Sequence, residues 1–292
     1  MNILNGPRRE RRLTLHGGAR IWATPEGDGL RLDDGRLAHA RDVVHLPPTA
    51  PTKVLCVHTN YMSRIYEIGG THDRPPVPTY FQKPLSALSG HGGEIGLPEG
   101  CKFLNYEGEL AVIVGRPMRN VEPDEVWDNI AGFTVANDIT IHDLRDADMN
   151  SMLRVKGADG FCPIGPGIVW GVDVRKSTLR TFLNGDLVQE GDIAEQVFGI
   201  EELVSDLARH ITLEVGDVIL TGTPANSRPM KAGDVVEVEI TGVGRLRNTV
   251  VATPAPRATI GSQPQDNAGI RKISLGIDER LPPHLTRNKN LI

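Results

Sequence analysis

Two glutamates near the middle of the chain carry the clearest chemical signal in this sequence. Glu107 and Glu109 lie two residues apart in the stretch 104–115, and the apolar run 110–114 follows them. Residues two apart on a β-strand point to the same face, so both carboxylates would project side by side. Burial strengthens the repulsion between like charges, and a divalent cation relieves it. Oxygen ligands favour Mg²⁺, Mn²⁺ or Ca²⁺ over Zn²⁺. The alternative is an exposed strand end at which water solvates both glutamates.

Short apolar segments separated by turns surround this acidic pair and predict a β-rich fold. Asn184-Gly185 lies between two apolar runs, which is typical of a β-hairpin, and Gly-Asp pairs precede the apolar runs 218–220 and 235–240. Successive short strands of this kind favour a closed or rolled sheet over a parallel α/β layer. The glycine-rich stretch 90–100 is predicted to be a loop.

Fewer segments have helical periodicity. The best is 194–210, where apolar residues recur at i, i+3, i+4 and i+7 from Ile200. Pro123 suits the first turn of a helix over about 123–131, and shorter helical segments are predicted at 62–67 and 142–152.

Changes in composition divide the chain into three parts. Residues 1–50 alternate short segments and turns, and they predict a small N-terminal β domain that ends at a proline-rich linker. Residues 51–254 form the predicted main domain, in which a polar loop helps to make a lid over about 60–78. Residues 255–292 contain few apolar clusters and are interpreted as a C-terminal tail that packing on the body or on a partner subunit would order.

The overall composition excludes several classes of function. The chain has 292 residues, is 39% hydrophobic and carries a net charge of -5 without a block of either sign. We therefore expect no binding to nucleic acid or to an anionic membrane surface, and no stretch approaches the length of a membrane span. Three widely spaced cysteines argue against a disulfide framework or a zinc knuckle, so a cytoplasmic location is expected.

Five motifs between residues 53 and 250 resemble, in order and spacing, those of the fumarylacetoacetate hydrolase family. They are Tyr106-Glu-Gly-Glu-Leu-Ala-Val-Ile-Val-Gly, Ala136-Asn-Asp138, Lys156-Gly-Ala-Asp159-Gly-Phe-Cys-Pro-Ile-Gly-Pro, Asn184-Gly-Asp-Leu-Val-Gln189 and Thr221-Gly-Thr-Pro224. The stretches 153–160 and 242–246 are most similar to one branch, the homoprotocatechuate-pathway proteins with decarboxylase and isomerase activity on 2-hydroxymuconate-type diacids.

The resemblance implies a fold and a metal site. The fold would be α+β and mainly β, a mixed β-roll that usually forms a homodimer, with its active site at the mouth of the roll. The metal ligands would be Glu107, Glu109 and Asp138. A site made only of carboxylates suits Mg²⁺ or Mn²⁺, with Ca²⁺ as a further candidate. For Asp138 alone, a turn or capping residue is the alternative.

The resemblance also implies residues that would contact the substrate. Lys156 matches the active-site lysine of the family and would hold a substrate carboxylate or an enolate oxygen. Thr223 and Lys83 match a substrate contact and a recurrent position of the family. The alternatives are a surface lysine on a glycine-rich loop for Lys156, a plain turn before proline for Thr223, and a structural role for Lys83.

The lid departs from the family pattern at two positions. Family hydrolases and decarboxylases usually carry a His and a Glu on the lid after an Asn-Tyr pair; here Arg64 replaces the His, and Glu67 is kept. Four residues after the ligand aspartate the family usually has Arg, and this chain has His142. We hypothesise that His142 supplies the acid/base function and that Arg64 binds a substrate carboxylate through both nitrogens of its fork. The alternative for His142 is a polar helix residue near the metal.

Two other histidines, His58 and His72, are alternatives for the acid/base role. His58 and His72 lie near the lid, and His91 in its glycine-rich loop is expected to be solvated.

Three functions remain open from the sequence. The first is a metal-dependent decarboxylation or isomerisation of a 2-oxo or 2-hydroxyenoic diacid through an enolate, with substrates of the 5-carboxymethyl-2-hydroxymuconate or 2-hydroxyhepta-2,4-diene-1,7-dioate type. The second is C–C bond hydrolysis of an acylpyruvate such as fumarylpyruvate or maleylpyruvate. The third is a catalytically inactive member of the family that acts as a binding protein.

Overall fold

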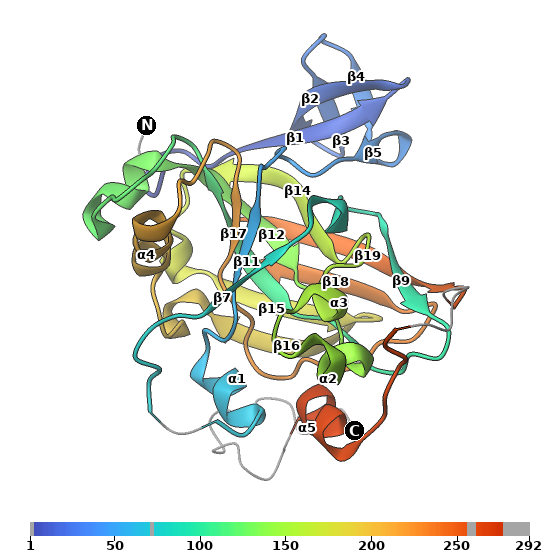
Figure 1. Ribbon diagram of the computed structural model, residues 1–292. Coiled ribbons are helices and arrows are strands. Elements are labelled where there is room, and N and C mark those ends of the chain that lie inside the picture. Colours follow the sequence, from blue (N-terminus) through green and yellow to red (C-terminus); the bar gives the residue numbers. More distant parts are fainter. Residues whose placement is uncertain (1–2, 71–72, 256–260, 277–292) are drawn as a thin grey trace.

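The computed structural model describes residues 3–70, 73–255 and 261–276, and its fold is α+β with strands predominating (Figure 1). One mixed sheet of twelve strands runs through the molecule. Its main path is β4 (Leu37–His39), β3 (Gly29–Leu32), β2 (Ala19–Glu26), β1 (Arg9–His16), β14 (Cys162–Trp170), β12 (Ile130–Asn137), β11 (Gly108–Val114), β17 (Val218–Leu220), β6 (Val54–Val57) and β7 (Tyr80–Lys83). Two short strands complete it: β5 (Val44–His45) pairs with β1, and β8 (Leu88–Ser89) pairs with β14.

A second sheet packs against the middle of the first. Its order is β16 (Asp186–Asp192), β15 (Thr178–Leu183), β18 (Val235–Ile240), β19 (Gly244–Thr253) and β9 (Glu94–Pro98). The two sheets come very close at Gly108, where a Cβ would lie only 2.9 Å from Val238. Glycine therefore allows the acidic segment to enter the interior. A third, two-stranded sheet pairs β10 (Leu104–Asn105) with β13 (Thr140–Ile141).

Helices are few and short. They are α1 (Met62–Glu67), α2 (Arg145–Asp148), α3 (Leu153–Lys156), α4 (Ile200–His210) and α5 (Ala268–Leu275), with 3₁₀ turns that include Pro123–Asn129 and His142–Leu144. The predicted helix at 194–210 is confirmed from Ile200 onwards, and its apolar face joins the main core. Burial of each large apolar side chain of this kind contributes about 1.5–3 kcal/mol. Among the described residues, no helix is both long and apolar enough to span a membrane.

Two local predictions were wrong in part. The stretch 90–100 is not only loop, because Glu94–Pro98 forms β9 and pairs in parallel with β19. A single extended segment that pairs with a strand about 155 residues further along the chain gives no periodic signal of its own. The helix predicted over 142–152 ends at Asp148, because the residues at 149, 150 and 152 have positive φ angles.

One end of the molecule is made of strands and the other of helices. Figure 1 shows β2–β5 projecting at one end, while α1, α2 and α5 gather at the other. The predicted N-terminal unit 1–50 therefore consists of β1–β5, and β1 extends into the main sheet through its pairing with β14. Within the predicted tail, the described residues 261–276 contain α5, whose Ile270 is buried. The domain boundaries at 50 and 254 stay predictions.

Candidate metal centre and active site

Two antiparallel strands bring the three predicted metal ligands together. β11 pairs with β12, so Glu107, just before β11, lies beside Asp138, just after β12. The backbone N–H of Asp138 donates to the carbonyl oxygen of Glu107 at 2.8 Å, and the N–H of Glu107 donates to Oδ1 of Asn137 at 2.8 Å. Glu109, the second residue of β11, lies beside these two carboxylates. One oxygen from each of the three carboxylates lies within 4.8 Å of the others, and all three residues are buried.

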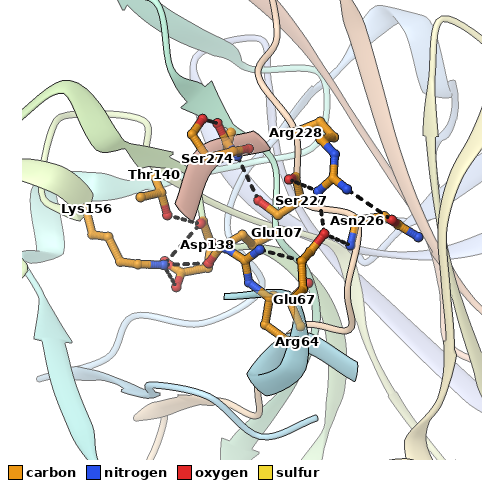
Figure 2. Close-up of polar contacts among 12 residues, drawn as sticks. Arg64, Glu67, Glu107, Asp138, Thr140, Lys156, Asn226, Ser227, Arg228 and Ser274 are labelled. Atoms are coloured by element: carbon orange, nitrogen blue, oxygen red, sulfur yellow. Dashed lines mark hydrogen bonds and ion pairs between the residues drawn. The ribbon is translucent and has the colours of Figure 1, made fainter. Parts of the chain in front are cut away.

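Lysine side chains balance the charge of this triad. Lys156 Nζ donates to Glu107 Oε2 at 2.7 Å and to Asp138 Oδ2, and Lys83 Nζ donates to Asp138 Oδ1 (Figure 2 shows Lys156). Lys83 is fully buried, which is unfavourable for a cation unless a carboxylate pairs with it. Glu109 has no lysine partner among the described residues and accepts a hydrogen bond from the backbone N–H of Gly222 at 2.6 Å.

The three carboxylates differ in how easily they ionise. Burial raises the pKa of Glu109 well above its usual value, and the nearby charge of Asp138 adds to this effect. Burial also opposes ionisation of Glu107, but the charges of Lys156 and Arg64 outweigh it and hold the pKa of Glu107 below its usual value. Burial disfavours the charged form of Lys156 too, yet Asp138 and Glu107 raise its pKa, so this ammonium stays protonated.

The donor set fits a divalent metal ion. Three buried carboxylates offer only hard oxygen ligands, which suit Mg²⁺, Mn²⁺ or Ca²⁺. A buried cluster of this kind is unstable without cations, and the two lysine ammonium groups offset only part of its charge. The acidic triad could therefore hold a metal ion.

The lid residues Arg64 and Glu67 are both bonded to other side chains (Figure 2). Arg64 Nη1 donates to Glu67 Oε2 at 2.6 Å, and its Nη2 lies 3.4 Å from Glu107 Oε1. The other oxygen of Glu67 accepts from Arg228 and from the backbone N–H of Asn226 at 3.0 Å. Both predicted lid residues therefore lie beside the triad, and each is held by at least two partners.

A cavity of about 30 Å³ that is partly open to solvent lies between the triad and the lid. Its walls include five of the predicted site residues, namely Arg64, Glu107, His142, Lys156 and Thr223. Thr223 is oriented by Gln189, whose Nε2 donates to Thr223 Oγ1 at 2.8 Å. The other four predicted site residues do not line the cavity: Glu67, Lys83, Glu109 and Asp138.

His142 has an unusual environment. It is 1% exposed, and neither ring nitrogen has a hydrogen-bond partner within the described part of the chain. Burial lowers the pKa of His142 well below its usual value, and the charges of Arg64, Arg145 and Lys156 act in the same direction. The ring is therefore neutral at neutral pH, with one nitrogen available to accept a proton.

The other histidines differ in whether they line the cavity. His58 also lines the cavity, and burial together with Lys156 lowers its pKa to about 4. His91 lies away from this cavity and is half-buried, so the expectation that it is solvated was wrong. His72 lies outside the described residues.

The sequence patterns did not predict several residues of the site. Arg145 and Ile273 line the cavity, Arg228 bonds Glu67, and Gln189 holds Thr223. Gln189 ends a motif already noted, so its position was a usable signal. Ile273 belongs to α5, which only the folded chain brings to the site.

Residues 53–251 match the fumarylacetoacetate (FAA) hydrolase C-terminal family domain. The chain belongs to this family. Both the N-terminal strands β1–β5 and helix α5 lie outside the matched residues.

Two relatives within the family are named as enzymes. The chain is 38% identical over 208 residues to the 4-hydroxyphenylacetate degradation bifunctional isomerase/decarboxylase of Salmonella dublin, covering 70% of this chain and 48% of that protein, so it spans about half the length of this relative. It is 32% identical over 241 residues to the oxaloacetate tautomerase YisK of Bacillus subtilis, covering 78% and 79% of the two chains.

Solved structures agree with the fold. The 5-carboxymethyl-2-hydroxymuconate delta-isomerase from Mycobacterium smegmatis has a TM-score of 0.76 and 35% identity, with 84% of this chain and 99% of that chain covered. The fumarylacetoacetate hydrolase-type fold and the resemblance to the isomerase/decarboxylase branch are thus confirmed.

Proposed function

We propose that the protein catalyses isomerisation or decarboxylation of a 2-oxo or 2-hydroxyenoic diacid, with Mg²⁺ held by Glu107, Glu109 and Asp138. The observation that carries this proposal is His142, a buried neutral histidine with two unpaired ring nitrogens in the wall of the cavity. Such a ring can accept a proton from a carbon acid. The names of the isomerase/decarboxylase and tautomerase relatives support the same chemistry.

A divalent ion, when bound, would polarise the 2-oxo group and stabilise the negative charge that develops on its oxygen. In isomerisation, a ring nitrogen of His142 takes the proton from the carbon next to the carbonyl, and the C–H electron pair forms the enolate. The same nitrogen returns the proton to another carbon of the conjugated chain. In decarboxylation, the carbon next to the carbonyl loses CO₂ in place of a proton. The electron pair of the broken C–C bond forms the enolate, which then takes a proton from water.

Lys156 complements this chemistry because it stays protonated. Its ammonium group lines the cavity beside Glu107 and Asp138, where it can donate to the substrate carboxylate or to the developing enolate oxygen. Thr223, held by Gln189, presents a hydroxyl to the same cavity. These residues bind and orient the acid end of the substrate.

Glu67 argues against the hydrolytic alternative. Arg64, Arg228 and the backbone N–H of Asn226 all donate to its carboxylate, so this group is engaged in structural bonds. A base that activates water must be directed at that water, whereas three of the four lone-pair sites of this carboxylate face protein donors and Glu67 does not line the cavity. This favours proton transfer within the substrate over C–C bond hydrolysis.

Deuterium exchange at C3 of 2-oxoadipate in D₂O with Mg²⁺ tests the proposal, because exchange reports enolate formation directly. We expect wild-type protein to catalyse exchange and His142→Asn to lower the rate about 10²- to 10⁴-fold, with an unchanged melting temperature. Retention of the wild-type rate by the variant would contradict the role of His142. Release of pyruvate and a free acid from an acylpyruvate would instead support hydrolysis.

We further propose a homodimer that works in the cytoplasm and binds a small 2-oxo acid, without nucleic-acid or membrane partners. The net charge of -5 supports the absence of nucleic-acid and membrane partners, and the three free cysteines support the cytoplasmic location. The homodimer and the 2-oxo acid ligand follow from the family resemblance alone.

A further inference from the structure

Three cationic side chains line the active-site cavity, and their bonding differs. Lys156 is bonded to Glu107 and Asp138, and Arg64 to Glu67 and Glu107. The side chain of Arg145 makes no hydrogen bond or ion pair with any residue in the described ranges 3–70, 73–255 and 261–276, although the residue is half-buried. Among the described residues, the cavity therefore contains one guanidinium whose side-chain donors are free.

The free guanidinium lies in a position that is unfavourable without a ligand. Burial lowers the pKa of Arg145, and the like charge of Arg64 lowers it further, while Glu107 and Asp146 oppose this effect. A cation that is partly desolvated and close to a second cation destabilises the folded state until an anion pairs with it. An incoming carboxylate would supply that anion.

The backbone around Arg145 is fixed on both sides. The Asp143 carboxylate accepts hydrogen bonds from the N–H groups of Lys102, at 2.7 Å, and Phe103, at 2.8 Å. On the other side, Asn267 at the start of α5 donates to Asp146 Oδ2 at 2.7 Å. Arg145 therefore extends from a braced segment, and its direction into the cavity does not depend on a mobile loop.

The charges of the site also favour a second carboxylate on the ligand. Four cationic side chains line the cavity or bond to the triad (Arg64, Lys83, Arg145, Lys156), against the three carboxylates of the triad. Glu67 and Arg228 neutralise each other, so the formal surplus is one positive charge, and a divalent ion raises it to three. A 2-oxo monoacid brings one negative charge and a 2-oxo diacid brings two, so the diacid compensates more of the surplus.

The bonding of Arg64 leaves the far carboxylate to Arg145. Both ends of the Arg64 guanidinium face protein carboxylates, whereas the fork of Arg145 is free to make two parallel hydrogen bonds. Ile68 and Ile273 add apolar surface to the same cavity, which suits the carbon chain between two polar ends.

We propose that Arg145 binds the carboxylate at the far end of the substrate and so makes the site selective for 2-oxo diacids over 2-oxo monoacids. This inference rests on the proposed function, because the other end of the ligand is taken to be held by the metal triad and Lys156.

A matched pair of ligands tests it by calorimetry with Mg²⁺ present. 2-Oxoadipate and 2-oxohexanoate have the same chain length and differ only in a terminal carboxylate in place of a methyl group. We expect wild-type protein to prefer the diacid, and Arg145→Gln to weaken binding of the diacid about 10- to 100-fold while changing binding of the monoacid less than about threefold. Arg145→Lys, which keeps the charge but not the fork, should recover part of the preference.

The control is Arg20→Gln, which removes one charge from an exposed position on β2 and should leave both affinities unchanged. If Arg145→Gln keeps the full preference for the diacid, or Arg20→Gln loses it equally, the role of Arg145 is overturned. If wild-type protein binds neither ligand with Mg²⁺, the proposed function fails as well, so the two failures are distinguishable. Melting curves of each variant separate loss of the ligand contact from loss of the fold.

Discussion

Glu109 is the member of the acidic triad whose charge has the least support from the protein. Its carboxylate is 1% exposed, accepts one backbone hydrogen bond from Gly222 and has no lysine partner in the part of the chain that the structure describes. Lys83 and Lys156 serve the other two carboxylates. A bound divalent ion would therefore contribute most to stabilising the charge at this residue.

Glu109→Gln should separate metal binding from folding. The amide oxygen of glutamine can accept the same Gly222 N–H bond, so we expect the melting temperature without metal to stay close to that of wild type. Addition of Mg²⁺ or Mn²⁺ should stabilise wild-type protein, by about 2.7 kcal/mol at a hundredfold excess over Kd, and should leave the variant unchanged. Thermal melting with and without the ion measures both effects.

Glu99→Gln is the matched control, because Glu99 is exposed and does not belong to the group of carboxylates that could hold the metal ion. It should retain the full stabilisation by metal. An equal response to the ion in wild type and Glu109→Gln would show that Glu109 is not a ligand. A wild-type protein that does not respond to any of the three candidate ions would favour the catalytically inactive binding protein.

At the scale of elements, two histidines join the N-terminal strands to the body. His45 ends β5, and His91 lies in the turn before β9; their ring centroids are 5.0 Å apart in a T-shaped arrangement. His91 Nδ1 accepts a hydrogen bond from the backbone N–H of Arg247 at 3.2 Å, which requires this nitrogen to be unprotonated. Burial lowers the pKa of His91 to about 4, and His45, Arg12 and Arg247 add to the effect, while Glu237 opposes it.

Stability should therefore fall as the pH is lowered from about 6.5 to about 4. In that window the unfolded chain binds a proton at His91 while the folded protein does not, so protonation favours unfolding; above pH 6.5 the contribution is fully present. The loss from this residue is about 2–3 kcal/mol. Denaturant unfolding at pH 7.5 and pH 4.5 measures it, and His91→Asn should lose less stability over that interval than wild type.

His39→Gln is the control, because His39 is exposed on β4. Its loss of stability with falling pH should equal that of wild type. If His91→Asn also matches wild type, the acid sensitivity arises at other groups and this assignment is wrong.

At the scale of the whole molecule, one buried aspartate ties the start of the main domain to its later strands. Asp217, directly before β17, is fully buried and accepts hydrogen bonds from the backbone N–H groups of Thr52 at 2.9 Å and Lys53 at 3.0 Å. It also accepts from the N–H of Glu214 at 2.7 Å and pairs with the Lys53 ammonium. These contacts align β6 with β17, and the parallel pairing of these two strands continues the sheet that carries β11.

Asp217→Ala should destabilise the protein by about 3–5 kcal/mol, because it leaves several buried donors without an acceptor. Denaturant midpoints measure the change. Asp28→Ala, at an exposed turn, should alter stability by less than about 0.5 kcal/mol. A loss for Asp217→Ala no larger than for this control would mean that the linker is held by other contacts.

The sequence by itself determined the location of the chemistry. Glu107 and Glu109 are close in sequence, so the period-2 geometry of a strand was enough to place both carboxylates on one face. The helix from Ile200 and the hairpin at Asn184-Gly185 follow from local patterns in the same way. Asp138, Lys156 and Thr223 were found through the family motifs, because each motif is a short local stretch.

Only the tertiary structure decided how the charges around the triad are shared. Arg64 and Glu67 are paired with each other and with distant groups, whereas the Arg145 side chain has no partner among the described residues, although nothing in the local sequence distinguishes the two arginines. Ile273 reaches the cavity from a helix outside the matched family residues. Such contacts join residues far apart in the chain, and burial fixes the pKa values of residues such as His142. A local pattern contains neither kind of information.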